Sequence, residues 1–426
     1  MLDLIVRNAT LADGRRGIDV GVEAGRIAAV EPHLQAAAGQ TIDAQGLLLA
    51  PPFVDSHFHM DATLSVGLPR RNRSGTLLEG IALWGELKPT LVQEAIVERA
   101  LAYCDWAVAR GLLAIRSHVD ICDPRLLAVD ALLEVKKKVA PYIDLQLVAF
   151  PQDGLYRSPG ALKLLQEALR RGVDVVGGIP HFERTMEDGR ASVRALCEIA
   201  AAQGLLIDMH CDETDDPLSR HVETLAAETV RLQGRVVGSH LTSMHSMDNY
   251  FVSKLIPLMA EADLGVIANP FANMVLMGRH DTYPKRRGMT RVPELMAAGL
   301  TVALGHDSVM DPWYGLGGGD MLDVAHMAVH VAQMTGLDAM AACFAAVTEN
   351  AARLLHLEDY GLAPGCWADM VLLDAHDPVE AIRLRATRLK VIRRGKVIAE
   401  SPRQRPALAL PGRPGEVSFL WPPTKS

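Results

Sequence analysis

Five residues that can bind a metal ion follow short apolar runs at four separate places in the chain. They are His57, His59, His210, His240 and Asp307. Imidazole and carboxylate groups bind both zinc and ferrous iron. Residues two apart in a strand point to the same face, so the rings of His57 and His59 can reach one ion. The pattern predicts one catalytic metal centre assembled from distant segments.

Other residues of ligand type have a weaker pattern. His118 ends an apolar run without a spaced partner, so a structural or pocket-wall role fits it as well as ligation, and the same holds for His181. His306 adjoins Asp307, and Cys211 adjoins His210. Neighbouring strand residues point to opposite faces, so neither is expected to share the ion.

Glu213 is the second informative residue, because it lies three positions beyond His210, just past the expected end of a strand. A carboxyl group there can reach a substrate without binding the metal, and it can act as a general acid and base. The alternative is a solvated loop carboxylate, a description that suits the neighbouring Asp212, Asp215 and Asp216 better.

The elements that must position these residues form an alternating pattern of strands and helices. The expected strands span residues 48–59, 112–120, 145–152, 173–180, 205–210, 235–240, 264–270 and 301–307. Helical patterns lie between them at residues 91–109, 124–139, 160–171, 186–203 and 221–232. This count and alternation predict an α/β fold of the (β/α)8 TIM-barrel type. Side chains at the strand carboxyl ends would then meet at the catalytic face.

Both ends of the chain have β character instead. Strands are expected at 4–6, 20–22 and 26–30, then at 368–374, with a hairpin at 389–398. We predict a small β-sandwich domain from residues 1–51 and 361–426, flanking a catalytic barrel of residues 52–360. The tail from Ser401 is rich in proline and arginine.

Composition excludes several classes of protein. The 426 residues are 49% hydrophobic and 22% charged with a net charge of −8, and no basic run of the kind that binds nucleic acid is present. No apolar run reaches the roughly 18 residues of a membrane span, and the amino terminus lacks signal-peptide features. The six scattered cysteines form no C-x-x-C pair. We expect a cytoplasmic protein with free thiols.

The chain resembles the cytosine deaminase branch of the amidohydrolase superfamily over nearly its whole length. The resemblance is carried by residues 51–61, 74–81, 149–152, 210–213, 239–246, 305–314 and 361–369. The H-x-H pair is a broad mark of the superfamily. The segments His210-Cys211-Asp212-Glu213 and 305–314 are much narrower.

The resemblance implies a role for each matching residue. The ligands of one divalent metal ion, Zn²⁺ or Fe²⁺, would be His57, His59, His210 and Asp307. His240 would help to activate the attacking water together with Asp307, and Glu213 would carry a proton to the ring nitrogen. Binuclear relatives place a carboxylated lysine at the end of the fourth strand. Residues 173–180 contain no lysine, which favours a single ion.

The resemblance also implies a substrate pocket. Gln152 would hydrogen-bond a ring carbonyl and the adjacent N–H, since an amide offers both a donor and an acceptor. Leu77 and Trp313 would form walls beside the ring. The expected activity is hydrolysis of a C–N bond in a cyclic amidine, with release of ammonia from a free nucleobase, in pyrimidine salvage. Relatives commonly assemble, so a homo-oligomer is expected.

One departure from the family bears on the choice of base. Cytosine deaminases of this type carry a second aspartate directly after the metal-binding one, and here Ser308 stands in that position. Serine removes volume and a negative charge, so the freed space can accept a methyl group at C5. A buried methyl is worth about 0.8 kcal/mol from burial alone, so discrimination of roughly tenfold to a few hundredfold is expected. We predict 5-methylcytosine as the favoured substrate, with cytosine retained more weakly.

Three other hypotheses remain open. The first is deamination of a different heterocycle, such as isoguanine or an aminotriazine. The second is ring amide hydrolysis, against which the missing fourth-strand lysine argues. The third is a non-catalytic binding protein, which is hard to reconcile with retention of every expected ligand and of Glu213.

Overall fold

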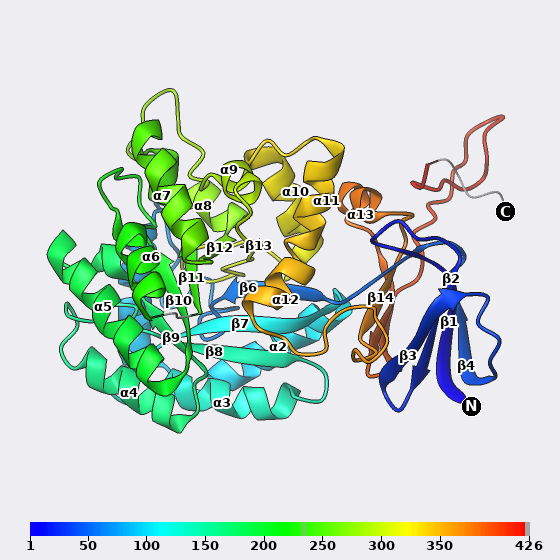
Figure 1. The fold of residues 1–426 in the computed structure, drawn as a ribbon, viewed down its shortest axis with the longest axis horizontal. Helices are drawn as coiled ribbons and strands as arrows, with labels where there is room; N and C mark the ends of the chain where they lie inside the picture. The colour runs from blue at the N-terminus through cyan, green and yellow to red at the C-terminus, as the bar shows by residue number, and fades with distance from the viewer. Residues whose placement is uncertain (233–234, 422–426) are drawn as a thin grey trace.

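The computed structural model describes residues 1–232 and 235–421, so the last five residues of the predicted tail lie outside the described part. The chain forms two sheets side by side, a barrel surrounded by helices and a smaller sheet that holds both ends of the chain (Figure 1). Within the described residues, no helix is long and apolar enough to cross a membrane.

The barrel contains eight parallel strands that pair in chain order. They are β6 (Phe53–Phe58), β7 (Leu112–Asp120), β8 (Asp144–Phe150), β9 (Val175–Gly178), β10 (Leu206–Cys211), β11 (Val236–His240), β12 (Gly265–Ala268) and β13 (Val302–Leu304). A parallel bridge between Phe58 and Asp307 joins the last segment to the first. The predicted fold class is therefore confirmed.

Most of the helices follow the barrel strands and cover the outside of the barrel, while the last one follows a strand of the small sheet. They are α1 (Leu77–Leu87), α2 (Gln93–Ala109), α3 (Leu127–Val139), α4 (Ala161–Arg171), α5 (Met186–Gln203), α6 (His221–Leu232), α7 (Asn249–Glu261), α8 (Pro270–Leu276), α9 (Val292–Ala297), α10 (Met321–Val331), α11 (Leu337–Ala345), α12 (Glu349–Leu354) and α13 (Pro378–Leu384). The five helices that we predicted from periodicity all form. The ends of helix α5 are set by its capping residues. The Thr185 side chain caps the first turn, and Gly204 ends the helix in a left-handed conformation.

One strand prediction is wrong. Residues 48–59 form two strands, β5 (Leu48–Ala50) and β6, and not a single barrel strand. The break falls at Pro51 and Pro52, which have no backbone N–H to donate to a ladder. Strand β5 pairs with β1 and β14 in the small sheet, while β6 enters the barrel.

The small sheet is mixed and is built from both ends of the chain. Its members are β1 (Leu2–Leu11), β2 (Ile18–Glu23), β3 (Arg26–Pro32), β4 (Ala38–Asp43), β5, β14 (Met370–Leu373), β15 (Arg388–Arg393) and β16 (Lys396–Glu400). The predicted hairpin is present as β15 and β16, whereas β4 was not predicted. Apolar residues of both halves share one core. The domain limits at 51/52 and 360/361 stay a prediction.

Candidate metal centre and active site

The structure brings four of the predicted ligands to one point at the barrel mouth. Donor atoms of His57, His59, His210 and Asp307 all lie within 4.8 Å of one another. The Nε2 atoms of His59 and His210 are 3.0 Å apart, and Asp307 Oδ1 lies 3.3 Å from His57 Nε2 and 3.4 Å from His59 Nε2. Ligands of a tetrahedral zinc ion, with bonds of about 2.0–2.1 Å, lie roughly 3.3 Å apart. The donor set therefore fits one divalent cation.

The hydrogen bonding of these side chains supports the same fit. Both ring nitrogens of His57 and Nδ1 of His210 are buried and make no regular hydrogen bond within the described part of the chain. A buried polar atom without a partner costs about 1–3 kcal/mol. A bound ion would satisfy His57 Nε2, which lies 3.3 Å from Asp307 Oδ1 in the cluster. Phe150 stacks on His210 with ring centroids 4.0 Å apart, which limits rotation of that ligand.

The backbone near the centre adopts an uncommon conformation. His240 and Asp307 both have φ of 72°, in the left-handed region that non-glycine residues seldom occupy. Asp307 N–H donates to the His57 carbonyl at 2.8 Å, and His59 N–H donates to the Asp307 carbonyl at 3.0 Å. These bonds hold Asp307 against the end of β6, so the carboxylate turns back toward the two histidines.

Electrostatics in the cluster keep Asp307 ionised and most of the rings neutral. Burial works to raise the pKa of Asp307, but His240, His57 and His59 outweigh it and hold the pKa well below its usual value. Burial lowers the pKa of His57, and neighbouring His118 adds to the effect. Burial likewise lowers the pKa of His210. Neutral imidazoles and a carboxylate are the forms that bind a metal ion.

Glu213 lies beside the cluster with a raised pKa. Burial and the negative charge of Asp307 raise the pKa of its carboxyl well above the usual value. Its Oε1 is 3.4 Å from Nδ1 of His240, whose pKa burial lowers to about 4. A buried carboxylic acid of this kind can donate a proton to a substrate.

Two asparagines that were not predicted orient His240. Asn273 accepts a hydrogen bond from Asn269 N–H through Oδ1, so its amide nitrogen faces Nδ1 of His240 at 2.9 Å. Since an amide N–H donates, Nδ1 acts as the acceptor and the ring proton belongs on Nε2. Asn269 also lies 3.3 Å from the ring. Like the ligands, Asn269 directly follows an apolar strand, a signal that could have found it.

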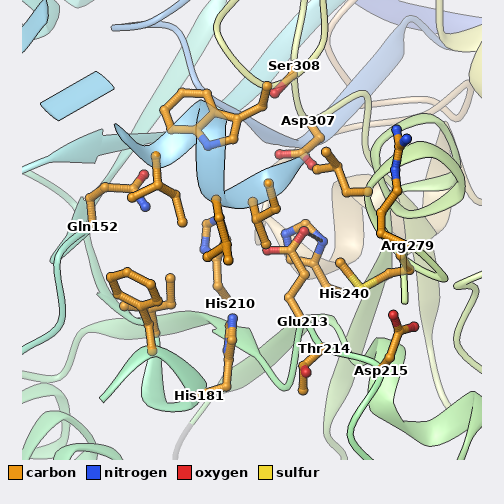
Figure 2. Close-up of a pocket in the computed structure, with 18 of the residues that line it drawn as sticks. Gln152, His181, His210, Glu213, Thr214, Asp215, His240, Arg279, Asp307 and Ser308 are labelled. Carbon is orange, nitrogen blue, oxygen red and sulfur yellow. Dashed lines mark ion pairs between the residues drawn. The ribbon is translucent and has the colours of Figure 1, made fainter. Parts of the chain in front are cut away.

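A cavity of about 290 Å³ opens above the cluster (Figure 2). Its walls include the predicted substrate-binding residues Leu77, Gln152, Ser308 and Trp313, together with His59, His210, Glu213, His240 and Asp307. The lining is mainly apolar with a few polar groups, as is usual for a small-molecule site. Gln152 lies on one side of the cavity and Arg279 on the other (Figure 2).

Trp313 is held in place by residues that sequence reasoning missed. The Asp311 carboxylate accepts hydrogen bonds from the backbone N–H groups of Trp313 and Tyr314, both at 2.9 Å. A Cβ at Gly80 in α1 would lie 2.5 Å from the Trp313 ring, so only glycine leaves room for it. The ring also lies 5.8 Å from Trp84 between centroids.

A second buried polar cluster lies deeper in the barrel. Arg116 donates to Asp208 Oδ2 at 2.9 Å, to Gln146 at 2.7 Å and to the Leu354 carbonyl at 2.9 Å. The Ser239 hydroxyl donates to Asp208 Oδ1 at 2.6 Å. His118 links the two clusters, with Nε2 3.6 Å from Asp208 and its ring centroid 4.1 Å from that of His57.

The remaining candidates lie around these clusters. His181 lines the cavity, and burial lowers its pKa to about 3. His306 does not join the ligand set, because its Nδ1 lies 3.0 Å from the Ser308 carbonyl and its ring packs on Phe271. Cys211 is buried outside the donor set found in the described residues. The expectation that Asp212 is a solvated loop carboxylate is wrong, because Asp212 is buried and pairs with His221 at 2.7 Å.

Comparisons with known proteins identify the family and several relatives of the chain. The family model described as "Amidohydrolase family" matches residues 40–399. The solved structure of 5-methylcytosine deaminase from Klebsiella pneumoniae with 5-fluorocytosine superposes with a TM-score of 0.91 at 43% identity, covering 94% of this chain and 98% of that chain.

Curated relatives act on other heterocycles by name. N-isopropylammelide isopropyl amidohydrolase of Pseudomonas sp. (strain ADP) is 28% identical over 93% of this chain and 97% of its own length. Pterin deaminase of Rhizobium rhizogenes is 30% identical over 82% of this chain and 80% of its own length. The names of these two relatives differ in the ring compound on which each enzyme acts.

Proposed function

We propose that this chain, which belongs to the amidohydrolase family and is a hydrolase of C–N bonds in cyclic compounds, deaminates a free aminopyrimidine base. The favoured reaction is 5-methylcytosine to thymine, with cytosine to uracil as a weaker one. The observation that carries the proposal is Glu213, a buried carboxyl group of raised pKa inside the cavity and beside the ligand cluster. Ring deamination needs such a proton carrier, because an amine leaves poorly until it is protonated.

In this proposal each residue has a defined task. His57, His59, His210 and Asp307 hold one divalent cation, which would lower the pKa of the attacking water toward neutrality. Gln152 binds the C2 carbonyl and the neighbouring N–H, while Leu77 and Trp313 confine the ring.

Proton transfers accompany both the addition of water and the loss of ammonia. Water adds to C4 as Glu213 gives its proton to N3, and His240 and Asp307 orient that water and take part in removing its proton. The proton that the water loses returns through His240 and Asp307 to Glu213, which then passes it to the exocyclic amine. The C4–N bond breaks and ammonia leaves with the bonding electron pair. The C4 hydroxyl gives its proton to Glu213 as the C4 carbonyl forms, which restores the carboxylic acid.

Ser308 supports the preference for a methyl group at C5. It lines the cavity directly after Asp307, and its small side chain leaves space in that wall. The comparison with 5-methylcytosine deaminase points in the same direction. An aspartate in this position would fill the space and add a negative charge.

Steady-state kcat/KM values for 5-methylcytosine and cytosine, measured by ammonia release, test the proposal. We expect at least a tenfold preference for 5-methylcytosine and a reversal in Ser308→Asp. Ser308→Ala is the matched control, because it removes the hydroxyl without adding bulk and should keep the preference. A clear preference of the wild type for cytosine would contradict the role given to Ser308.

A second candidate is deamination of a larger heterocycle. The cavity of about 290 Å³ offers more room than one pyrimidine fills, and the curated relatives include a pterin deaminase. Isoguanine, a pterin and an aminotriazine belong in the same assay. Turnover of one of these above both pyrimidines would favour the second candidate.

The proposal also covers the metal ion, the cellular location and the assembly of the enzyme. Zinc or ferrous iron is the proposed ion, and metal analysis of the purified protein distinguishes them. The six cysteines are unpaired in the structure, which supports a cytoplasmic location. We also propose that the enzyme is a homo-oligomer. Its substrate is a free nucleobase, and it does not bind nucleic acid.

A further inference from the structure

Arg279 lines the outer end of the cavity and carries an unneutralised charge. Its Nε donates to the Val275 carbonyl at 2.6 Å and its Nη2 to the Gly75 carbonyl at 2.7 Å. Both acceptors are uncharged. Among the residues that the structure describes, no carboxylate lies within 4.0 Å of its guanidinium nitrogens, so this residue of the cavity wall keeps its positive charge without an acidic partner.

Asp215, an acidic residue of the same cavity wall, does not cancel this charge. Asp215 lies below Arg279 in Figure 2. Its Oδ2 accepts a hydrogen bond from Gly278 N–H at 2.8 Å, and its Oδ1 lies 3.4 Å from His245. The carboxylate is therefore held by the loop that carries Arg279, and the guanidinium keeps free N–H donors.

The two segments at the mouth are strongly basic, although the chain has a net charge of −8. Segment 66–76 contains Arg70, Arg71 and Arg73 and no acid, and segment 277–291 contains Arg279, Lys285, Arg286, Arg287 and Arg291 against Asp281 alone. The bond from Arg279 to Gly75 joins the segments. Some of this charge is neutralised, since Arg70 pairs with Glu79 and Glu86. Arg286 likewise pairs with Asp281 and Arg291 with Glu294, and Arg279 is the arginine of these segments that lines the cavity. The remaining positive charge near the cavity attracts anions from solution.

The position of Arg279 relative to Gln152 selects one substituent of the ring. Gln152 and Arg279 lie on opposite sides of the cavity (Figure 2). If Gln152 holds the C2 carbonyl, the position across the six-membered ring is C5. A substituent at C5 then extends away from Gln152, past the wall that contains Ser308 and toward the side of Arg279.

We propose that Arg279 is a substrate-binding residue for an acidic group at C5, so that the enzyme takes aminopyrimidines bearing a carboxylate there as well as the methylated base. The proposal rests on the function proposed above. The free guanidinium N–H groups hydrogen-bond the carboxylate, and the remaining positive charge near the cavity increases its rate of arrival. Charge-assisted hydrogen bonds from arginine to a carboxylate are among the strongest in proteins.

A purely structural role for Arg279 predicts a different result. If it served only to join segments 66–76 and 277–291, its replacement would affect every substrate alike. A pair of ligands that differ in charge but not in shape separates the two roles. 5-Carboxycytosine and its neutral amide, 5-carbamoylcytosine, form such a pair.

The experiment compares kcat/KM for this pair, and for 5-methylcytosine, in wild type and in Arg279→Gln. We expect the wild type to prefer the carboxylate over the amide, and Arg279→Gln to reduce that ratio about tenfold. Turnover of 5-methylcytosine should change less than about twofold. Raising the ionic strength should slow the carboxylate alone. Arg170→Gln is the matched control, since Arg170 pairs with Glu167 on the outer helix α4.

Equal losses for the acid and the amide in Arg279→Gln, or no preference for the acid in the wild type, would overturn the proposal. If neither compound is turned over, calorimetric binding of the same two compounds to wild type and variant replaces the kinetic comparison with the same expected ratios. Failure of 5-methylcytosine turnover contradicts the proposed function instead, and the binding comparison still decides the role of Arg279.

Discussion

The barrel contains two buried polar clusters, and they differ in how their hydrogen bonds are satisfied. Asp208 in the deep cluster accepts bonds from Arg116 and Ser239. In the cluster at the mouth, nitrogens of His57 and His210 have no regular partner in the described chain. Both clusters draw on strand β10, where Asp208 and His210 are two residues apart and point into the same barrel.

The difference distinguishes a cluster that stabilises the barrel from a cluster that is suited to bind a ligand. A buried charge is tolerated when paired and hydrogen-bonded, as Asp208 is. Burial works to raise its pKa, but His118 and Arg116 outweigh it and hold the pKa below the usual value. Unpaired buried nitrogens reduce stability and persist where a ligand completes them. Four experiments test this contrast.

The largest expected effect is on chemistry at the mouth. Glu213→Gln keeps the size of the side chain but cannot carry the proton, so kcat should fall about 10²–10⁴-fold. Metal content and melting temperature should stay at wild-type values, since Glu213 lies outside the four-ligand set. A variant that retains wild-type kcat would remove Glu213 from the mechanism.

The deep cluster should respond in stability instead. Asp208→Asn leaves the Arg116 guanidinium buried without a counter-charge, and the free energy of unfolding should fall by about 3–5 kcal/mol. Denaturant unfolding measures this loss. Asp130→Asn, which breaks a surface pair with Arg171, is the control and should cost less than about 1 kcal/mol. Equal losses in both variants would erase the contrast between a buried and a surface pair.

The pH dependence tests the cost of burying an imidazole. Burial lowers the pKa of His181 to about 3, whereas an unfolded histidine titrates near about 6.5. The unfolded chain therefore binds the extra proton, and this contribution to stability is lost as pH falls below about 6.5. Between pH 7 and 5, wild type should lose up to roughly 2 kcal/mol more unfolding free energy than His181→Gln.

His33→Gln serves as the control for that measurement, because His33 is exposed. It should follow the wild-type pH profile. Parallel profiles for wild type and His181→Gln would show that the ring of His181 takes up its proton in the folded protein as easily as in the unfolded one.

The smallest expected effect concerns the cavity wall. Gly80→Ala places a methyl group 2.5 Å from the Trp313 ring and should displace it, raising KM a few-fold with little change in kcat. Gly85→Ala in the same helix meets nothing within 4 Å and should leave KM unchanged. A shift in kcat alone would indicate that Trp313 acts on the reacting atoms and does not only confine the ring.

Local pattern was enough to predict the barrel and most of its mouth. A short apolar run predicts a strand. The polar residue that follows the run is then expected at the face where the strand carboxyl ends meet. For this reason His57, His59, His210, His240 and Asp307 could be grouped from the sequence alone. The same local rule misplaced residues 48–59, because an apolar run does not show to which sheet each half belongs.

Other features depend on segments that meet only when the barrel closes. The partners of His240 are Asn269 and Asn273, about thirty residues away. Arg279 meets Gly75 across more than two hundred residues. The left-handed backbone at His240 and Asp307 was likewise not indicated by the strand pattern. Periodicity reports which way a side chain points along its own strand, whereas hydrogen-bond partners and cavity shape are set by the distances between strands after folding.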